Sequence, residues 1–149
     1  YHFARPGNRF WPALHGAGFT PRLLAPDDDA TFISLGIGIT NLVNRTTAKA
    51  SQVTNDELRA GAARLRRTVE RHRPVAVAVL GVSAYRVAFD DPAAAIGRVA
   101  KPLAGAELWI LPNPSGLNAH YQLPQLIDLF GAFRESVTSR ASSAAIVSE

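Results

Sequence analysis

The segment Val75-Ala76-Val77-Ala78-Val79-Leu80 limits the possible folds of this chain more than any other stretch does. Every residue in it is apolar, and Gly81 ends it. A strand with apolar side chains on both faces is typical of the interior of a parallel sheet, where helices cover the sheet on both sides. The segment therefore predicts a protein of the α/β class.

Shorter patterns on either side agree with that class. Residues 37–43 are rich in β-branched side chains and residues 107–111 are largely apolar, so both predict strands. Residues 54–57 fit a capping box, and apolar residues then recur at helical spacing until Pro74. Further helices are expected at about 9–15, at about 27–35, after Ser83 as a capping residue, and from Pro124 onward.

We therefore expect a three-layer α/β/α sandwich with a short central parallel sheet. Three strands are few for such a sheet, and the chain opens abruptly at Tyr1, so we expect that a first strand is missing upstream. Residues 1–135 are expected to form the domain. From Ser136 the chain is rich in Ser, Ala and Thr, which predicts a frayed tail over 136–149.

Several classes of chemistry are excluded or weakly supported. The chain has no cysteine, which excludes disulfides, thiolate metal sites and a thiol nucleophile. No metal site or nucleotide cofactor is expected, because the four histidines lack ligand spacing and no phosphate-binding glycine motif is present. Residues 81–85 and 113–116 each lack one glycine of a nucleophile elbow, so a serine hydrolase using Ser115 has little support.

The balance of charge is mildly basic. A formal net charge of +4 agrees with a polyanionic partner without requiring one. The run 27–29 of three aspartates is interpreted as compensation of a helix dipole, and the arginines between residues 59 and 73 as a solvated helix face. No apolar run approaches the ~20 residues of a membrane span, and no signal peptide opens the chain, so a cytoplasmic protein is expected. We also expect it to be a monomer.

The segment 111–118, Leu-Pro-Asn-Pro-Ser-Gly-Leu-Asn, is the candidate functional loop. It follows the apolar strand 107–111, and ligands of parallel α/β sheets bind just past the carboxyl ends of strands. An ordinary strand-to-helix connection is the alternative. Ser83 follows another strand end, where a turn into a helix offers either a phosphate cradle or a plain helix cap.

Three separated stretches carry a resemblance to a known family: 3–11 (Phe-Ala-Arg-Pro-Gly-Asn-Arg-Phe-Trp), 38–43 (Gly-Ile-Thr-Asn-Leu-Val) and 111–117 (Leu-Pro-Asn-Pro-Ser-Gly-Leu). Together they resemble the mismatch-specific uracil/thymine DNA glycosylases, the Mug branch of the uracil-DNA glycosylase superfamily. The match runs from Tyr1 to about Arg134 in the family's order.

The resemblance implies a monofunctional enzyme of base-excision repair with double-stranded DNA as its partner. Such an enzyme flips uracil or a related damaged pyrimidine, chiefly opposite guanine, out of the duplex and hydrolyses its N-glycosidic bond. Phe3 would stack on the flipped base, with packing beside Phe10 and Trp11 as the alternative. Gly116, Leu117 and Asn118 would form the wedge that fills the hole, with packing of Leu117 on the last helix as the alternative.

Other family positions differ in ways that affect activity. Asn113 stands where the wider superfamily has a histidine, so it stabilises the leaving uracil anion only weakly. Ala119 replaces an arginine of better-known members, which weakens the expected contacts to the opposite guanine. Asn41 aligns with a position that reads the amide edge of uracil, and its side chain can both donate and accept a hydrogen bond. Ser83 and Ser115 are candidate phosphate ligands.

The family's water-activating asparagine lies in a Gly-Ile-Asn-Pro-Gly loop that would precede Tyr1. We therefore expect the 149-residue chain to bind DNA better than it cuts. A non-catalytic relative that recognises distorted or mismatched duplexes is the alternative function.

Overall fold

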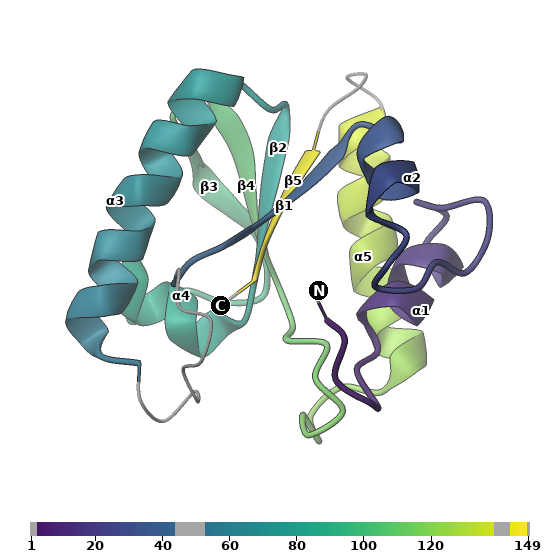
Figure 1. Cartoon of the computed structure of the whole chain (residues 1–149). Coiled ribbons are helices and arrows are strands. Elements are labelled where there is room, and N and C mark those ends of the chain that lie inside the picture. Colours follow the sequence, from purple (N-terminus) through teal and green to yellow (C-terminus); the bar gives the residue numbers. More distant parts are fainter. Residues whose placement is uncertain (1–2, 44–52, 139–143, 149) are drawn as a thin grey trace.

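A computed structural model describes residues 3–43, 53–138 and 144–148 of the chain. Its centre is a five-stranded sheet in the order β1-β5-β2-β4-β3 (Figure 1). The strands are β1 (Ile37–Asn41), β2 (Ala76–Leu80), β3 (Gly97–Leu103), β4 (Ala106–Leu111) and β5 (Ala144–Ser148). Strands β1, β5, β2 and β4 are parallel, and β3 runs antiparallel to β4 at one edge.

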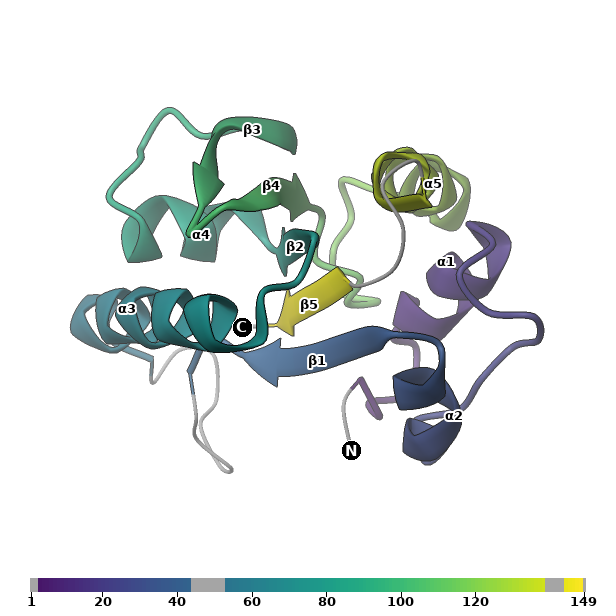
Figure 2. The same ribbon diagram turned by 90° about the horizontal axis from the view of Figure 1, so that it is seen from above.

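Helices cover both faces of this sheet, as Figure 2 shows from above. The helices are α1 (Phe10–Gly16), α2 (Asp29–Ser34), α3 (Asn55–His72), α4 (Val82–Ala88) and α5 (Leu123–Thr138). Helices α3 and α4 pack on one face, and α1, α2 and α5 pack on the other. The expected three-layer α/β/α architecture is confirmed. Within the described residues, no helix combines the length and the apolar character that a membrane crossing requires.

Strand β2 explains why the sheet needs both layers. All its residues are buried. Ala76, Ala78 and Leu80 belong to the core shared with α1 and α5, whereas Val77 and Val79 belong to the core shared with α3 and α4. Alternate side chains of a strand point to opposite faces, so an entirely apolar strand contributes to two cores at once.

Helix α3 begins with the predicted capping box. The Thr54 hydroxyl accepts a hydrogen bond from the Glu57 amide at 3.1 Å, and the Glu57 carboxylate accepts one from the Thr54 amide at 3.3 Å. Arg64 then donates to the carbonyl oxygen of Leu42 at 2.8 Å, directly after β1. Arg59 forms ion pairs with Asp56 and Asp90, which agrees with a solvated basic face. The helix is thereby fixed against the end of β1.

Strand β5 corrects the expectation of a frayed tail after Ser136. Residues 144–148 lie in the middle of the sheet and pair with both β1 and β2. Ile146 and Val147 are 1% and 0% exposed. The segment follows a run rich in Ser and Ala and contains only two residues that strongly favour strands, Ile146 and Val147, so its strand signal is weak. Hydrogen-bonded pairing with β1 and β2 stabilises this strand, although its own sequence only weakly favours one.

Strand β3 is not predicted by the sequence pattern either. It contains Arg98, Lys101 and Pro102, and its pairing with β4 is irregular between Val99 and Leu103. Polar residues and a proline are tolerated at an edge, where one side of the strand needs no sheet partner.

Two helix starts differ from expectation. Helix α4 begins at Val82 with Gly81 as its capping residue at φ 116°, so Ser83 lies in the first turn and is not the cap. Helix α2 starts after Asp28, whose carboxylate accepts the Ala25 amide at 2.8 Å and pairs with Arg22 at 3.3 Å. The pKa of Asp28 is lowered, chiefly by the hydrogen bond from the Ala25 amide and to a smaller extent by the contacts with Arg22. The aspartate run is therefore used in local structure.

Candidate DNA-binding loop and cavity

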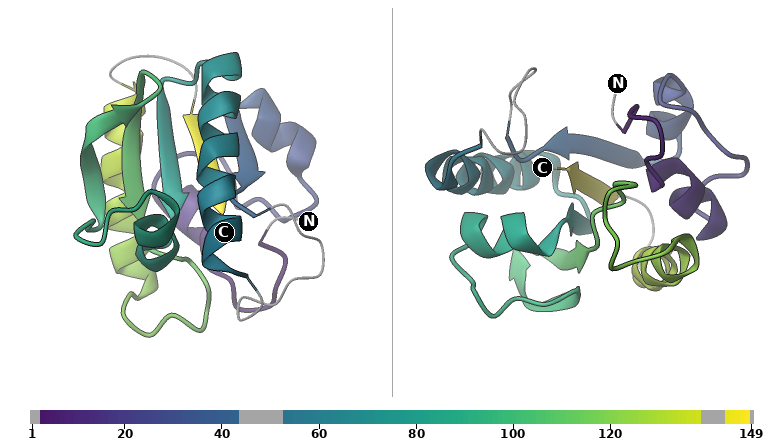
Figure 3. Two further views of the ribbon diagram at one scale, coloured as in Figure 1. Left: turned by 90° about the vertical axis from the view of Figure 1, so that its left-hand side faces the viewer. Right: turned by 90° about the horizontal axis from the view of Figure 1, so that it is seen from below.

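The loop 112–122 lies at the end of the sheet where the parallel strands finish (Figure 1). The amide of Gly81, just past β2, donates to the carbonyl of Leu111, the last residue of β4, at 2.8 Å. This bond joins the two strand ends at the point where the loop and α4 begin. Seen from below in Figure 3, the loop lies over the ends of the strands, next to the N-terminal segment.

Polar side chains within the loop determine its shape. The Asn113 Oδ1 accepts the Ser115 amide at 3.0 Å, and the Ser115 hydroxyl accepts the Leu117 amide at 3.2 Å. Asn118 donates through Nδ2 to the Asn113 carbonyl at 3.0 Å and accepts the His120 amide through Oδ1 at 3.1 Å. The loop is therefore held as a compact turn, and Asn118 supports the predicted wedge from inside.

Leu117 projects from the tip of this turn. Its side chain is 81% exposed, the highest value among the exposed large apolar residues of the described chain. The alternative expectation, that Leu117 packs on the last helix, is wrong. Exposing an isobutyl group to water is unfavourable, and a braced loop that does so is typical of a side chain used in contact with a partner.

A cavity of about 690 Å³ lies beside the loop. Its lining brings together most of the predicted site: Gly81, Val82, Ser83, Ile96, Pro112, Asn113, Ser115, Leu117, Asn118, His120 and Tyr121. The loop after β4 and the start of α4 thus form one site, although they are separated by the whole of β3 and β4. Backbone and side-chain amides and hydroxyls supply its polar groups.

Phe3 and Asn41 are not among the residues that line this cavity. The half-buried Phe3 ring is stacked on Phe10, with ring centroids 3.8 Å apart and an interplanar angle of 20°. The packing alternative is therefore correct for one face of the Phe3 ring. Asn41 is exposed at the end of β1, where its Oδ1 accepts a hydrogen bond from the Ser148 hydroxyl at 2.5 Å. Ser148 is a site neighbour that sequence reasoning misses, because β5 has only a weak local strand signal.

Arg9 is the second residue that sequence reasoning misses. Its guanidinium donates to four backbone carbonyls on the loop side of the site, those of Pro114, Ser115, Asn118 and Tyr121. A lone arginine after Gly-Asn in a loop carries no sequence signal for such a role, because its acceptors lie more than a hundred residues away.

A family model for the uracil DNA glycosylase superfamily matches residues 1–136. The chain belongs to the uracil DNA glycosylase superfamily. Membership implies a DNA glycosylase that acts on uracil, with DNA as its partner. The loop 112–122, its cavity and the Arg9 segment all lie within the matched residues, whereas β5 lies beyond them.

The site geometry is compatible with glycosylase chemistry. A flipped base needs a recess next to the strand ends, and the displaced stack needs an apolar group to occupy the gap. The cavity and Leu117 offer these two features side by side. In the described part of the chain, no cluster of three or more His, Asp or Glu side chains is arranged to hold a metal ion.

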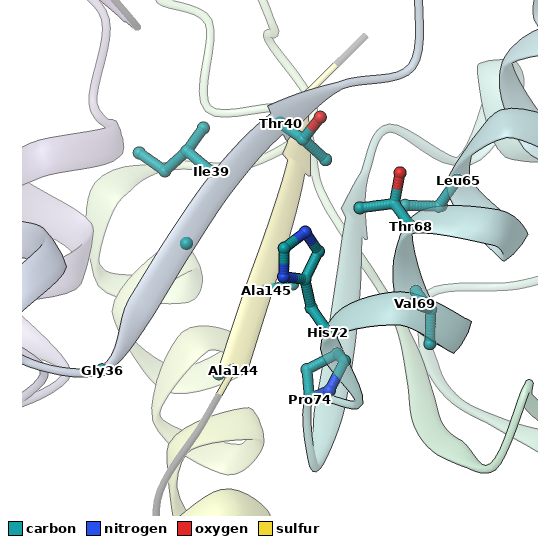
Figure 4. Close-up of a pocket in the computed structure, with 11 residues that line it drawn as sticks. Gly36, Ile39, Thr40, Leu65, Thr68, Val69, His72, Pro74, Ala144 and Ala145 are labelled. Atoms are coloured by element: carbon teal, nitrogen blue, oxygen red, sulfur yellow. The ribbon is translucent and has the colours of Figure 1, made fainter.

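A second cavity, of about 450 Å³, lies between α3 and the strands β1 and β5 (Figure 4). Its polar side chains are Thr40, Thr68 and His72, and the other lining residues are apolar or glycine. It shares no lining residue with the cavity beside the loop, so the two are separate features of the fold.

Proposed function

We propose that this protein is a mismatch-specific DNA glycosylase of the Mug type. It flips uracil, or a related damaged pyrimidine chiefly opposite guanine, out of duplex DNA and hydrolyses its bond to the sugar. The exposed Leu117 on a hydrogen-bonded loop, next to a cavity of about 690 Å³, is the observation that carries the proposal.

The wedge has a clear physical task. Extruding a base leaves a gap in the stack, and an apolar side chain that enters the gap replaces part of the lost stacking while it loses contact with water. Leu117 meets both needs, because it is already exposed on a loop whose backbone is fixed by Ser115 and Asn118. Little further ordering is required when DNA binds, which reduces the entropic cost of insertion.

The leaving-group side of the reaction falls to Asn113. Asn113 lines the cavity, and its side-chain amide can donate a neutral hydrogen bond to the departing uracil anion. A neutral donor stabilises an anion less than a charged imidazole does. We therefore assign Asn113 a modest catalytic contribution. Ser83 and Ser115, which line the same cavity, are the proposed phosphate ligands.

The water-activating side is proposed to come from a segment upstream of Tyr1. The resemblance to the Mug branch puts an asparagine there in a Gly-Ile-Asn-Pro-Gly loop, a sequence that does not occur in the 149 residues. Activity is therefore to be measured on the full-length protein, and DNA binding on the 149-residue chain as well.

The test is abasic-site formation on four substrates: G·U, A·U and G·T duplexes and single-stranded DNA containing uracil. We expect excision chiefly from G·U. Leu117→Ala should lower excision from duplexes about 5-fold to 150-fold, because the lost wedge is worth on the order of 1–3 kcal/mol, and should leave single-stranded cleavage nearly unchanged. Leu23→Ala, at a leucine that is 55% exposed, is the matched control.

The possible outcomes separate the candidate functions. Equal losses on duplex and single-stranded DNA in Leu117→Ala would contradict the wedge. Tight binding to mismatched duplexes without abasic sites would instead support the non-catalytic DNA-binding relative. The absence of both DNA binding and cleavage would refute both candidate functions.

A further inference from the structure

Two segments far apart in the sequence meet at the candidate site. The first is the N-terminal segment 3–9, and the second is the loop 112–122 that carries Leu117. The Arg9 amide donates to the Pro114 carbonyl at 2.9 Å, which brings the two backbones into direct contact.

The Arg9 side chain adds further hydrogen bonds to the same loop. Its Nη2 donates to the carbonyls of Ser115 at 2.6 Å and Asn118 at 3.1 Å, its Nη1 donates to that of Tyr121, and its Nε lies 3.4 Å from the Pro114 carbonyl. These acceptors enclose the tip of the loop, because Leu117 lies between Ser115 and Asn118. One half-buried side chain thus binds the loop both before and after the wedge.

Only a guanidinium fits this arrangement. Arginine presents five N–H donors in a rigid planar fork, whereas lysine presents a single ammonium on a flexible stem. Hydrogen bonds from a charged donor are about twice as strong as neutral ones, and carbonyls of a tight turn need such partners because they lie outside regular structure.

A backbone contact reinforces the same junction. A Cβ placed on Gly116 would lie 2.5 Å from the Gly7 carbonyl oxygen, so only glycine allows the two segments to approach this closely. The loop is therefore seated against the N-terminal segment on one side and bound by Arg9 on the other.

We propose that Arg9 is the positioning residue for the DNA wedge. It acts through the loop backbone, which it holds in the conformation that presents Leu117, and it does not touch the flipped base. This inference rests on the proposed function for the role of the wedge, but the clamp itself can be tested without DNA.

The first experiment measures amide hydrogen exchange in the free protein. Arg9→Gln should speed exchange at the Leu117, Asn118 and His120 amides at least about tenfold, because several charge-assisted bonds to the loop are lost, and should leave exchange in β2 and α3 unchanged. In Arg9→Lys, the exchange rates of these loop amides should lie between those of the wild type and those of Arg9→Gln. Arg5→Gln removes an equal charge from the same segment at an exposed position and should not change loop exchange. Unchanged loop exchange in Arg9→Gln would overturn the proposal.

Gly116→Ala tests the junction from the other side and covers the case in which Arg9→Gln fails to fold. Its added methyl group should push the loop from Gly7 and speed exchange at the same amides. Gly131→Ala in α5, where a Cβ meets no atom within 4 Å, controls for the loss of a glycine as such. Neither Gly116 nor Gly131 has positive φ, so neither substitution adds that kind of backbone strain.

The second experiment links the clamp to flipping and separates it from direct phosphate binding. With 2-aminopurine beside the mismatch of a G·U duplex, Arg9→Gln should reduce the flipping signal of the bound complex about tenfold while the slope of log Kd against log salt stays the same. If Arg9 bound a DNA phosphate instead, its substitution would make that slope less steep by about 1. If the wild-type chain shows no flipping signal, the proposed function fails, and hydrogen exchange still decides whether Arg9 holds the loop.

Discussion

Asn41 lies at the end of β1, outside the lining of the cavity beside the loop, and we propose that it reads the amide edge of uracil. Its exposed amide ends β1, and the Ser148 hydroxyl donates to its Oδ1 at 2.5 Å. That bond leaves Nδ2 as the donor for the uracil O4 and one lone pair of Oδ1 for N3–H. If Asn41 reads the base as proposed, this orientation of its amide would favour uracil over cytosine.

Substitution of these two residues should affect base reading to different degrees. Asn41→Ala should reduce uracil excision about 10-fold to 100-fold, because both hydrogen bonds to the base are lost. Ser148→Ala should cost about tenfold or less, since it removes one neutral hydrogen bond that acts indirectly. Single-turnover excision on G·U and A·U duplexes measures both. Wild-type rates for Asn41→Ala on every duplex would remove Asn41 from base reading.

Residues of the site differ in how far the sequence can predict them. Leu117 is predicted as an exposed wedge and is exposed, because a Pro-Ser-Gly loop offers no apolar surface to cover it. Phe3 is expected to face the base, yet one face of its ring is stacked on Phe10. Arg9 and Ser148 escape prediction, because their partners are distant in sequence and one of them lies on a strand with only a weak local signal.

At the scale of the elements, β5 is central to the sheet although its sequence carries only a weak strand signal. It lies between β1 and β2, so the sheet is continuous only if this strand is in place. Ile146 is 1% exposed and pairs in register with Ile39 and Ala78. Removal of β5 would leave two strand edges without partners next to the site.

Ile146→Ala tests this importance. The substitution removes buried methylenes and leaves a cavity in the core, so the free energy of unfolding should fall by about 2–5 kcal/mol. Ile33→Ala, at an isoleucine that is 68% exposed, should change it by less than about 0.5 kcal/mol. Urea denaturation followed by circular dichroism measures both variants. Equal effects would show that β5 contributes little to the folded state.

The elements that the sequence predicts well share a local cause. Helix α3 has its capping box and its apolar spacing within one segment, and β2 is recognised by an unbroken apolar run. Strands β3 and β5 owe their structure to neighbours instead. The position of β3 at the sheet edge tolerates its charges and its proline. Pairing with β1 on one side and β2 on the other stabilises β5.

In the molecule as a whole, the parallel strands direct the functional groups to one end. Asn41, Gly81, the loop after Leu111, and Ser148 each follow or end a different strand of the sheet. Helix α3 runs opposite to the strands, so its C-terminal arginines lie at the other end of the molecule (Figure 1). If DNA binds at the end that carries the loop, as proposed, the arginines in the C-terminal part of α3 should not contact it.

The salt dependence of binding tests this separation. With a formal net charge of +4, phosphate contacts should dominate affinity, and about four such contacts predict a loss of about 100-fold in affinity for mismatched duplex between 50 and 200 mM salt. The double variant Arg66→Gln/Arg71→Gln, at exposed positions in the C-terminal part of α3, should keep the wild-type slope of log Kd against log salt even though it removes two charges. Fluorescence anisotropy with a labelled G·U duplex measures both slopes.

A binding curve that is flat across this range would contradict the phosphate-driven interface. A slope reduced by about 2 in the double variant would instead place α3 on the DNA, because each lost phosphate contact lowers the slope by about 1.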